Sequence, residues 1–350
     1  MSFDLKSLVR KHILTVKPYS SARDEYEGEQ GIFLDANENT IGSTTTDGLY
    51  NRYPDPLQWE VKRELSKLKN IPSKQIFLGN GSDEPIDLLV RAFCEPYQDN
   101  IIQMPPTYGM YQVSADINVV KTIDVHLSAD FELDASKVLA AVTPATKIIF
   151  VCSPNNPTGN NLNRNEILTL IKSFSGLVVV DEAYIDFSTQ ASLLSEIATN
   201  PNLIVLQTFS KAWGLANLRL GMAFGSEEVI GVMNRIKPPY NINGVTQQLA
   251  LDALKNADLK DRMVKSIVAE REKLAKAFLK FPFVTKIYPS DTNFILLKTV
   301  DAMSIYKQLV AQQVIVRNRN TVVLCEGCLR ITVGTAAENE VLLTALAKCS

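Results

Sequence analysis

The stretch LIVLQTFSKAWGLANLRLGMAFG, residues 203–225, opens with an apolar run and then carries a lysine and an arginine, Lys211 and Arg219. The opening run predicts a strand that is buried on both faces of a sheet. A charged side chain beside such a strand either reaches solvent at the rim of the sheet or serves a ligand bound there. The rest of the chain must decide between these two interpretations.

Two further segments repeat this arrangement of a strand followed by polar residues. They are KIIFVCSPNNPTGNNL, which begins at Lys147, and GLVVVDEAYIDF, which begins at Gly176. Continuous apolar strands separated by helical stretches predict an α/β fold whose mostly parallel sheet is covered by helices on both faces. In such a sheet the polar residues that follow the strands converge on one crevice. The spacing of Asn163 and Glu166 also predicts a capping box before the helical segment NEILTLIKSF.

The character of the chain changes near residue 245. A long, charged segment with helical periodicity is followed by short alternating runs such as TNFILLK, VIVRN and LRITVG. We therefore expect a large domain over residues 30–245 and a smaller α+β domain formed by residues 1–29 and 246–350. The apolar residues of MSFDLKSLVRKHILTV have helical spacing and predict a docked amphipathic helix rather than a targeting peptide.

Composition argues against several classes of function. The 350 residues are 46% hydrophobic and 21% charged with a net charge of -2, and no basic stripe is interleaved with aromatic residues, so nucleic acid is not an expected partner. No apolar run has the length of about 20 residues that crosses a bilayer, so no membrane partner is expected. With only two histidines, a Ser-His-Asp triad or a histidine-bound metal is hard to assemble.

The five cysteines are odd in number and scattered along the chain. This usage favours a reducing, cytoplasmic compartment over a disulfide scaffold. Cys325 and Cys328 form a C-x-x-C pair with Glu-Gly between them and strand-like runs on either side. Because no second pair accompanies it, we interpret this pair as a hairpin turn rather than as a metal site, and we expect no metal.

Several single features indicate a ligand, and each also has a plain structural explanation. The turn around Gly81 precedes a helix start, which offers free N–H groups to a phosphate but is also common in ordinary turns. Asp181 ends a buried strand and is expected either in a salt bridge or beside a protonated ring nitrogen. In a desolvated crevice Lys211 would lose its proton more easily and become a nucleophile, and Arg219 offers a planar fork for a phosphate. Pyridoxal 5′-phosphate (PLP) needs all of these groups together.

Longer segments resemble the signature blocks of the fold type I PLP-dependent aminotransferases. These are CSPNNPTGN, VVVDEAYIDF and TFSKAWGLANLRLG; in addition, LDANENTIG, NRYPDP, GNGSDE and LRITVGTAAENE are similar to the class II branch that contains the histidinol-phosphate aminotransferases. The blocks occur in the family's order and cover nearly the whole chain. The resemblance implies a seven-stranded, mostly parallel sheet and a transaminase of histidine biosynthesis that exchanges an amine between glutamate and histidinol phosphate.

The resemblance also implies roles for individual residues. Lys211 is expected to bind the cofactor's aldehyde as a Schiff base and to shuttle a proton, and Asp181 is expected to keep the pyridine nitrogen protonated. Asn156 and Tyr184 are expected to donate to the phenolic oxygen, and Tyr108 is expected to stack on the ring. The expected phosphate-binding residues are Gly81, Ser82, Asp83, Ser210 and Arg219.

Substrate and subunit contacts follow from the same resemblance. Arg330 is expected to bind the carboxylate of glutamate or 2-oxoglutarate and, in the other half-reaction, the phosphate of histidinol phosphate. Arg317, Tyr19 and Arg23 are expected around the same anion. Tyr53, in NRYPDP, is expected to reach the PLP phosphate of the neighbouring subunit, so the resemblance implies a homodimer with shared active sites.

Other functions stay open at this point. A threonine-phosphate decarboxylase would keep the same lysine, aspartate and phosphate-binding arginine, and an aromatic amino-acid aminotransferase would use a similar ring pocket. A non-enzymatic regulator with this fold usually carries an additional DNA-binding domain, for which the chain leaves no room before the predicted fold begins. A sugar-phosphate binding module would not need both Asp181 and Lys211.

Overall fold

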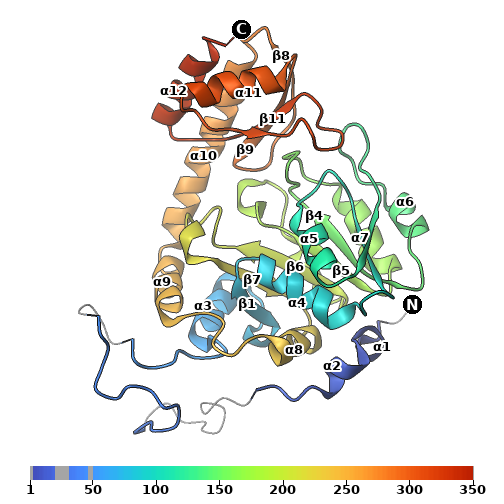
Figure 1. Ribbon diagram of the computed structural model, residues 1–350, viewed down its shortest axis with the longest axis vertical. Coiled ribbons are helices and arrows are strands. Elements are labelled where there is room, and N and C mark those ends of the chain that lie inside the picture. Colours follow the sequence, from blue (N-terminus) through green and yellow to red (C-terminus); the bar gives the residue numbers. More distant parts are fainter. Residues whose placement is uncertain (1–2, 20–30, 46–49, 350) are drawn as a thin grey trace.

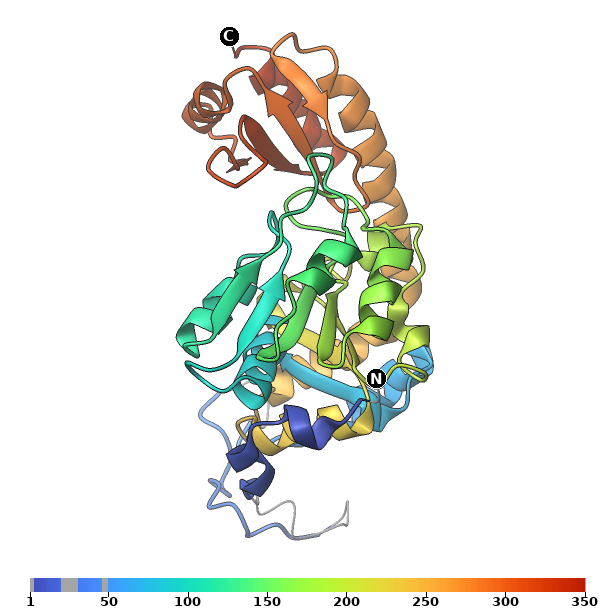
Figure 2. The same ribbon diagram turned by 90° about the vertical axis from the view of Figure 1, so that its right-hand side faces the viewer.

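The structure is a computed structural model that describes residues 3–19, 31–45 and 50–349. Figure 1 shows two α/β bodies, a large one below and a small one above, and the long helix α10 (Ala257–Phe278) that runs between them. The same arrangement is seen from the side in Figure 2. Among the described helices, none combines the length and apolarity that a bilayer crossing requires.

The large body contains a seven-stranded sheet with the order β1-β7-β6-β5-β4-β2-β3. All pairings within the block from β6 to β3 are parallel, while β7 runs antiparallel to both β6 and β1. The predicted mostly parallel sheet is therefore confirmed. Its strands are β1 (Ile76–Asn80), β2 (Asn100–Gln103), β3 (Lys121–Asp124), β4 (Thr146–Cys152), β5 (Leu177–Asp181), β6 (Leu203–Thr208) and β7 (Leu220–Phe224).

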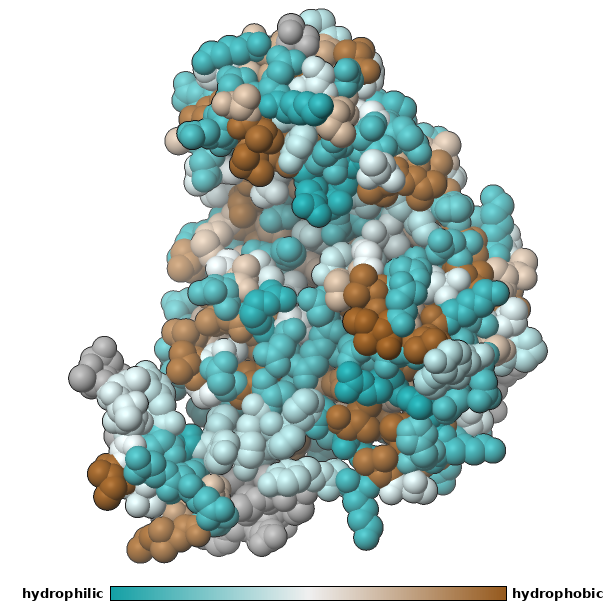
Figure 3. Space-filling model, viewed as in Figure 1, coloured by the Kyte–Doolittle hydropathy of each residue, from teal (hydrophilic) through white to brown (hydrophobic). Residues whose placement is uncertain are grey.

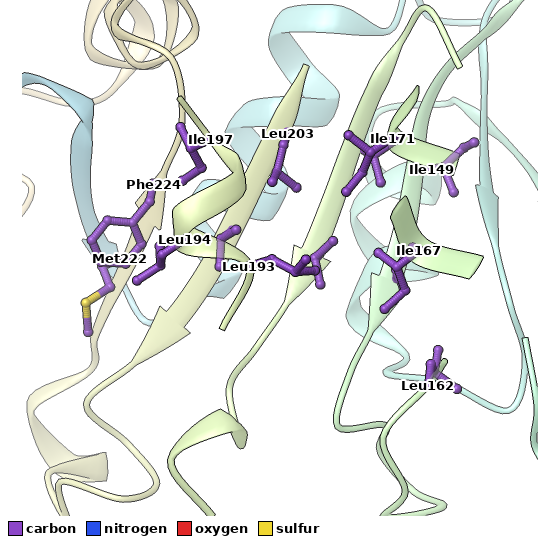
Figure 4. Packing of buried hydrophobic residues seen from close by; sticks show 14 of the residues in the cluster. Ile149, Leu162, Ile167, Ile171, Leu193, Leu194, Ile197, Leu203, Met222 and Phe224 are labelled. Carbon is purple, nitrogen blue, oxygen red and sulfur yellow. The ribbon is translucent and has the colours of Figure 1, made fainter. Parts of the chain in front are cut away.

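Helices cover both faces of this sheet because its central strands are apolar on both sides. In β5, Val178 and Val180 pack into one buried cluster while Leu177 and Val179 pack into another. Full burial of each such side chain stabilises the fold by about 1.5–3 kcal/mol. Figure 4 shows part of the first cluster, which includes Leu203 of β6 and Ile167 and Ile171 of the helix over residues 164–173. The first face is covered by α3 (Trp59–Lys69), α6 (Ala135–Ala140) and α7 (Arg164–Ser173), and the second by α4 (Asp83–Phe93), α5 (Met110–Ile117) and α8 (Glu227–Ile236).

The start of α7 differs in one detail from the predicted capping box. Asn163 is the N-cap, and its side chain accepts a hydrogen bond from the backbone N–H of Asn165. Glu166, however, accepts from the backbone N–H of Ala135 at 2.7 Å instead of turning back to the N-cap. The carboxylate therefore ties the start of α6 to α7, and the predicted reciprocal box is wrong. A complete capping box is present between Thr335 and Glu338.

The small body is built on a four-stranded antiparallel sheet with the order β10-β11-β9-β8. The residues of β11 alternate between its faces, so that Leu329 and Ile331 pack against the helices while Arg330 lines a cavity on the other side. The strands are β8 (Val284–Ile287), β9 (Phe294–Thr299), β10 (Arg317–Asn318) and β11 (Cys328–Thr332), and the covering helices are α10, α11 (Ala302–Ala311) and α12 (Ala336–Leu346).

Residues Cys325 to Cys328 form the turn that leads into β11. The backbone N–H of Cys328 donates to the carbonyl of Cys325 at 2.9 Å, and Gly327 supplies the positive φ, 75°, that such a turn requires. Both cysteines are free and buried. The interpretation of this pair as a hairpin turn is confirmed.

The N-terminal segment forms two short helices, α1 (Leu5–Leu8) and α2 (Lys11–Thr15), where one had been predicted. The break falls at Arg10, whose backbone is not helical and donates to the carbonyl of Ala92 at 3.0 Å. Val9 and Ile13 are buried beside α4 and α8. The described part of this segment thus packs on the large body, whereas we predicted it in the small domain; the boundary near residue 245 stays a prediction.

The remaining elements complete the connections. Helix α9 (Gly244–Leu254) packs on α3 and leads into α10, so the described chain passes from the large body to the small one once. Short 3-10 turns occur at Ser73–Gln75, Ile185–Phe187, Leu193–Glu196 and Ala216–Leu218.

Candidate active site

A cavity of about 780 Å³ lies between the carboxyl ends of the central strands and the small sheet. Figure 3 shows the surface hollowed between the small body at the top and the large body below. Asn156 follows β4, Asp181 ends β5 and Lys211 follows β6, so three neighbouring strands each deliver one polar side chain to the cavity. This is the convergence that the parallel sheet predicts.

The turn between β1 and α4 forms one wall of the cavity. Gly81 has a φ of 69°, and its N–H donates to the carbonyl of Arg219 at 2.7 Å. A Cβ atom on Gly81 would lie 2.7 Å from Nη2 of Arg219, and one on Gly221 would lie 2.3 Å from the carbonyl carbon of Gly81. The close approach of β7 to the Gly81 turn therefore requires glycine at position 221, and the positive φ favours glycine at position 81. The side chain of Ser82 makes no capping bond, so the first N–H groups of α4 are left for an anion.

Arg219 and Tyr108 both contact Asp83 at the start of α4. Nη2 of Arg219 lies 3.4 Å from Oδ2 of Asp83, and the hydroxyl of Tyr108 donates to Oδ1 at 2.9 Å. Arg219 has a left-handed backbone, with a φ of 50°, which costs a residue with a side chain about 1 kcal/mol. Such strain is typical of residues that a site holds in place. Ser210 lines the same wall, and its N–H donates to Thr208 Oγ1 at 3.1 Å.

Asp181 is almost completely buried and has two donors. The hydroxyl of Tyr111 donates to Oδ2 at 2.8 Å, and the backbone N–H of Ala183 donates to Oδ1 at 3.0 Å. Burial raises the pKa of this carboxyl to about 6, although both hydrogen bonds act in the opposite direction. No basic side chain of the described residues forms a salt bridge with it, which contradicts the plain structural explanation of this residue. A cation placed in the cavity would stabilise the ionised form.

Tyr111, the hydrogen-bond donor to Asp181, is a site residue that the sequence did not predict. Its ring is fully buried, stacks on Phe150 with centroids 4.7 Å apart and meets Tyr108 edge-on at 5.6 Å. In sequence Tyr111 is an aromatic residue in a helical segment and indicates only a core position. Its spacing of three residues from Tyr108 was the one available signal.

Lys211 is open to the cavity but is surrounded by protein atoms. Desolvation lowers the pKa of its ammonium group, and the positive charge of Arg330 lowers it further. Its Nζ lies 5.5 Å from the centroid of the Tyr184 ring. A lowered pKa increases the fraction of free amine at neutral pH, which is the nucleophilic form.

Arginines of the small sheet form the opposite wall. Nη1 of Arg330 donates to Oδ1 of Asn156, and the guanidinium lies 5.1 Å from the centroid of Phe294. Arg317 lies directly opposite Arg330 in the antiparallel register. Arg319 also lines the cavity and was missed, although its alternation with Arg317 in VIVRNRN placed the two on one strand face.

The remaining predicted residues have different outcomes. Tyr53 lies in a second cavity of about 880 Å³, where its ring stacks on Tyr240 at 4.5 Å. Tyr19 is 70% exposed and does not line the first cavity. Arg23 lies outside the described residues. The structure brings the following predicted residues together around the first cavity: Gly81, Ser82, Asp83, Tyr108, Asn156, Asp181, Tyr184, Ser210, Lys211, Arg219, Arg317 and Arg330.

The fold, with Lys211 and Asp181 in one cavity, defines a class of protein that known sequences and structures also identify. Residues 25–346 match the family model described as aminotransferase class I and II, so the chain belongs to this family. The chain is 56% identical to a histidinol-phosphate aminotransferase of Cytophaga hutchinsonii, over 99% of each chain. It is 54% identical to a histidinol-phosphate aminotransferase of Bacteroides fragilis, over 98% of this chain and 99% of that relative.

Solved structures agree on the fold. A histidinol-phosphate aminotransferase from Sinorhizobium meliloti, in complex with pyridoxal-5′-phosphate, superposes with a TM-score of 0.79 at 22% identity, covering 89% of this chain and 88% of that one. The corresponding protein from Clostridium acetobutylicum gives a TM-score of 0.79 at 20% identity, covering 85% and 90%. The predicted PLP-transferase fold type I is confirmed.

Proposed function

We propose that the protein is a PLP-dependent aminotransferase that interconverts histidinol phosphate and 2-oxoglutarate with imidazole-acetol phosphate and glutamate. The observation that carries this proposal is the placement of Lys211, Asp181 and Arg330 around one cavity. Relatives that share more than half of the sequence over nearly its full length carry this activity in their names. A threonine-phosphate decarboxylase also shares the fold, with a TM-score of 0.70 at 20% identity, which supports no statement about chemistry.

The cavity fits the chemical groups of PLP. The close approach of β1 and β7 leaves the N–H groups of α4, with Ser82, Ser210 and Arg219, to bind the phosphate. Asp181, which forms no salt bridge with the residues that the structure describes, would hold the proton of the pyridine nitrogen. When bound, PLP supplies an electron sink for the negative charge that develops on the Cα of the substrate.

The residues of the chain perform the binding and proton transfers. Lys211 would supply the amine that holds the cofactor's aldehyde group, and its Nζ would serve as the base that accepts and returns the substrate proton. Desolvation favours this role because it lowers the pKa of the ammonium group. Asn156 and Tyr184 would bind the phenolic oxygen, and Tyr108 would hold the ring in place. Arg330 and Arg317 bind the substrate anion, which is a carboxylate in one half-reaction and a phosphate in the other.

The two half-reactions, followed separately by the cofactor absorbance, test the proposed function. Glutamate should convert the PLP form to the amine form, and imidazole-acetol phosphate should convert it back. Histidinol phosphate should also produce the amine form without release of carbon dioxide. Release of carbon dioxide from threonine phosphate, without glutamate-dependent amine exchange, would instead identify a decarboxylase. Exchange with phenylalanine as fast as with histidinol phosphate would identify an aromatic aminotransferase.

We also propose that the protein is a homodimer in which Tyr53 serves the partner's site. The segment that precedes Tyr53 extends from the large body at the lower left of Figure 1, and three of its apolar side chains, Ile32, Leu34 and Ile41, are 92%, 78% and 96% exposed. Apolar side chains this exposed on an extended segment are typical of a surface that another chain covers.

We also propose a cytoplasmic location for the protein. The free cysteines support this proposal, because disulfides are rare in a reducing compartment.

Mixing two inactive variants tests the shared site. In a dimer of one Lys211→Ala subunit and one Tyr53→Ala subunit, one site receives an intact lysine and an intact tyrosine. Random mixing should therefore restore about a quarter of the wild-type activity. Unmixed samples of each variant are the control. No gain on mixing, in samples shown by light scattering to be dimers, would mean that Tyr53 does not cross the interface.

Replacing Tyr111 by Phe should change the pH dependence of cofactor binding. The lost hydrogen bond favours the ionised carboxylate, so the pKa of Asp181 should rise above its value of about 6. Because the ionised form pairs with the pyridinium, PLP affinity should begin to fall at a higher pH than in the wild type. Absorbance titrations of the cofactor-free protein between about pH 5 and 8 measure this. Tyr97→Phe, at an exposed tyrosine, is the control; coinciding curves for Tyr111→Phe and the wild type would contradict the prediction.

A further inference from the structure

Three arginines share one face of the hairpin formed by β10 and β11. Arg317 is the direct partner of Arg330, and the N–H of Arg319 donates to the carbonyl of Cys328 at 2.9 Å, which continues the same register. Residues two apart on a strand lie on the same face, so Arg319 is the diagonal neighbour of Arg330. All three arginines line the cavity that contains Lys211.

Nothing in the described part of the chain neutralises these three charges. Arg330 donates to the neutral amide of Asn156, and neither Arg317 nor Arg319 has a carboxylate within salt-bridge distance. Nε of Arg319 is buried and has no hydrogen-bond partner. Desolvation, followed by the charges of Arg330 and Arg317, lowers the pKa of Arg319 to about 10, so it keeps its charge at neutral pH.

Like charges that face one another across a hairpin destabilise it, and a buried donor without a partner adds a further cost. An anion in the cavity relieves both. The loop that carries Arg319 is also held in place, because Asn320 Oδ1 accepts from the N–H of Gly327 at 2.8 Å and Cys325 and Cys328 are fully buried. Arg319 is therefore presented to the cavity by a fixed turn.

The two substrates of the proposed reaction differ in how they can use a third guanidinium. The carboxylate of glutamate that the phosphate replaces carries one charge on two oxygens, which one or two planar forks satisfy. A phosphate monoester carries nearly two charges at neutral pH on three oxygens. A third guanidinium can therefore bond to the third oxygen of the phosphate, whereas the carboxylate has no such oxygen.

We propose that Arg319 is a specificity-determining residue that, together with Arg317 and Arg330, favours a phosphate dianion over a carboxylate as the anionic group bound at this site. This inference rests on the proposed function. Arg319 lies outside the sequence segments that resemble the family, and it was not among the expected substrate-binding residues.

The test uses the PLP-loaded Arg319→Gln protein and measures kcat/KM separately for histidinol phosphate and for glutamate. Loss of one charge-assisted hydrogen bond should lower the value for histidinol phosphate by about ten- to a hundredfold. The value for glutamate should change by less than about threefold, since its anion keeps Arg330 and Arg317. Arg319→Lys should recover part of the loss, because it restores the charge without the fork.

Arg262→Gln removes an exposed arginine of α10 and should leave both values unchanged. Equal losses for the two substrates in Arg319→Gln, or no loss for either, would overturn the inference. If wild-type protein reacts with glutamate but not with histidinol phosphate, the proposed function fails instead. The inference is then decided by how strongly inorganic phosphate inhibits the glutamate half-reaction. The inhibition constant of phosphate should rise at least tenfold in Arg319→Gln. An unchanged inhibition constant would refute the inference.

Discussion

Lys211→Ala should lower the rate of amine exchange by about four orders of magnitude or more in both half-reactions. In the proposed function, the substitution removes both the amine that would hold the cofactor and the base that would transfer the substrate proton. Desolvation and the charge of Arg330 lower the pKa of this lysine, which favours its free amine as the base that the variant loses. Single-turnover absorbance with glutamate and with histidinol phosphate measures the loss.

Two further measurements separate chemistry from folding for Lys211→Ala. After treatment with borohydride, PLP should stay attached to the wild-type protein and should wash away from the variant. A small primary amine added to the variant should restore part of the rate, because the cavity is open where Lys211 stands. Lys265→Ala, at an exposed lysine of α10, should behave like the wild type. Covalent PLP in Lys211→Ala would show that another residue binds the aldehyde.

Asp181→Asn should reduce kcat by about a thousandfold or more while PLP still binds through its phosphate. The amide keeps the shape of the carboxyl but cannot hold a proton on the pyridine nitrogen, so the ring withdraws electrons poorly. The absorbance of the bound cofactor should shift accordingly. Stopped-flow measurement of the glutamate half-reaction gives the rate. Asp258→Asn, on the exposed start of α10, is the matched control.

The same substitution should stabilise the cofactor-free protein at alkaline pH. Burial raises the pKa of Asp181 from the model-compound value of 3.8 to about 6, so the folded state binds the proton more tightly than the unfolded state. The free energy of unfolding therefore falls as the pH rises from about 4 to about 6, by roughly 3 kcal/mol in total. Asp181→Asn should abolish this decrease in urea unfolding curves measured at pH 4 and pH 8. A wild-type protein equally stable at both values would contradict the prediction.

The sequence predicted the large sheet well because each central strand is a continuous apolar run. Such runs have no polar face, so they require helices on both sides, and their ends must meet at one edge. Asp181 and Lys211 were found by this rule alone. The alternating run VIVRN indicated β10, but its restriction to two residues and the break between α1 and α2 could not be predicted, because they depend on the pairing of Arg317 with Arg330 and of Arg10 with Ala92.

The residues missed in the site have a common physical reason. Tyr111 acts through a hydroxyl on an otherwise apolar ring, and a sequence pattern cannot distinguish that from core packing. Glu166 has the spacing of a capping box but bonds to α6, because tertiary contacts override a local motif. The substrate side of the cavity is supplied by another sheet more than a hundred residues away, so Arg330 was found through the family resemblance and Arg319 was not found at all.

The single passage through α10 has a mechanical consequence. The helix contains 22 residues and is therefore about 33 Å long. One end of the helix lies at the large body and the other packs on the sheet whose strands β10 and β11 carry Arg317 and Arg330, so the angle of α10 sets the distance between these arginines and Lys211. A tilt of roughly 5° at its root would shift the far end by about 3 Å, which is close to the length of two C–C bonds. Such a tilt would change the distance between the arginines and Lys211, so substrates of unequal length would be accommodated by a change in angle without any change of side chain.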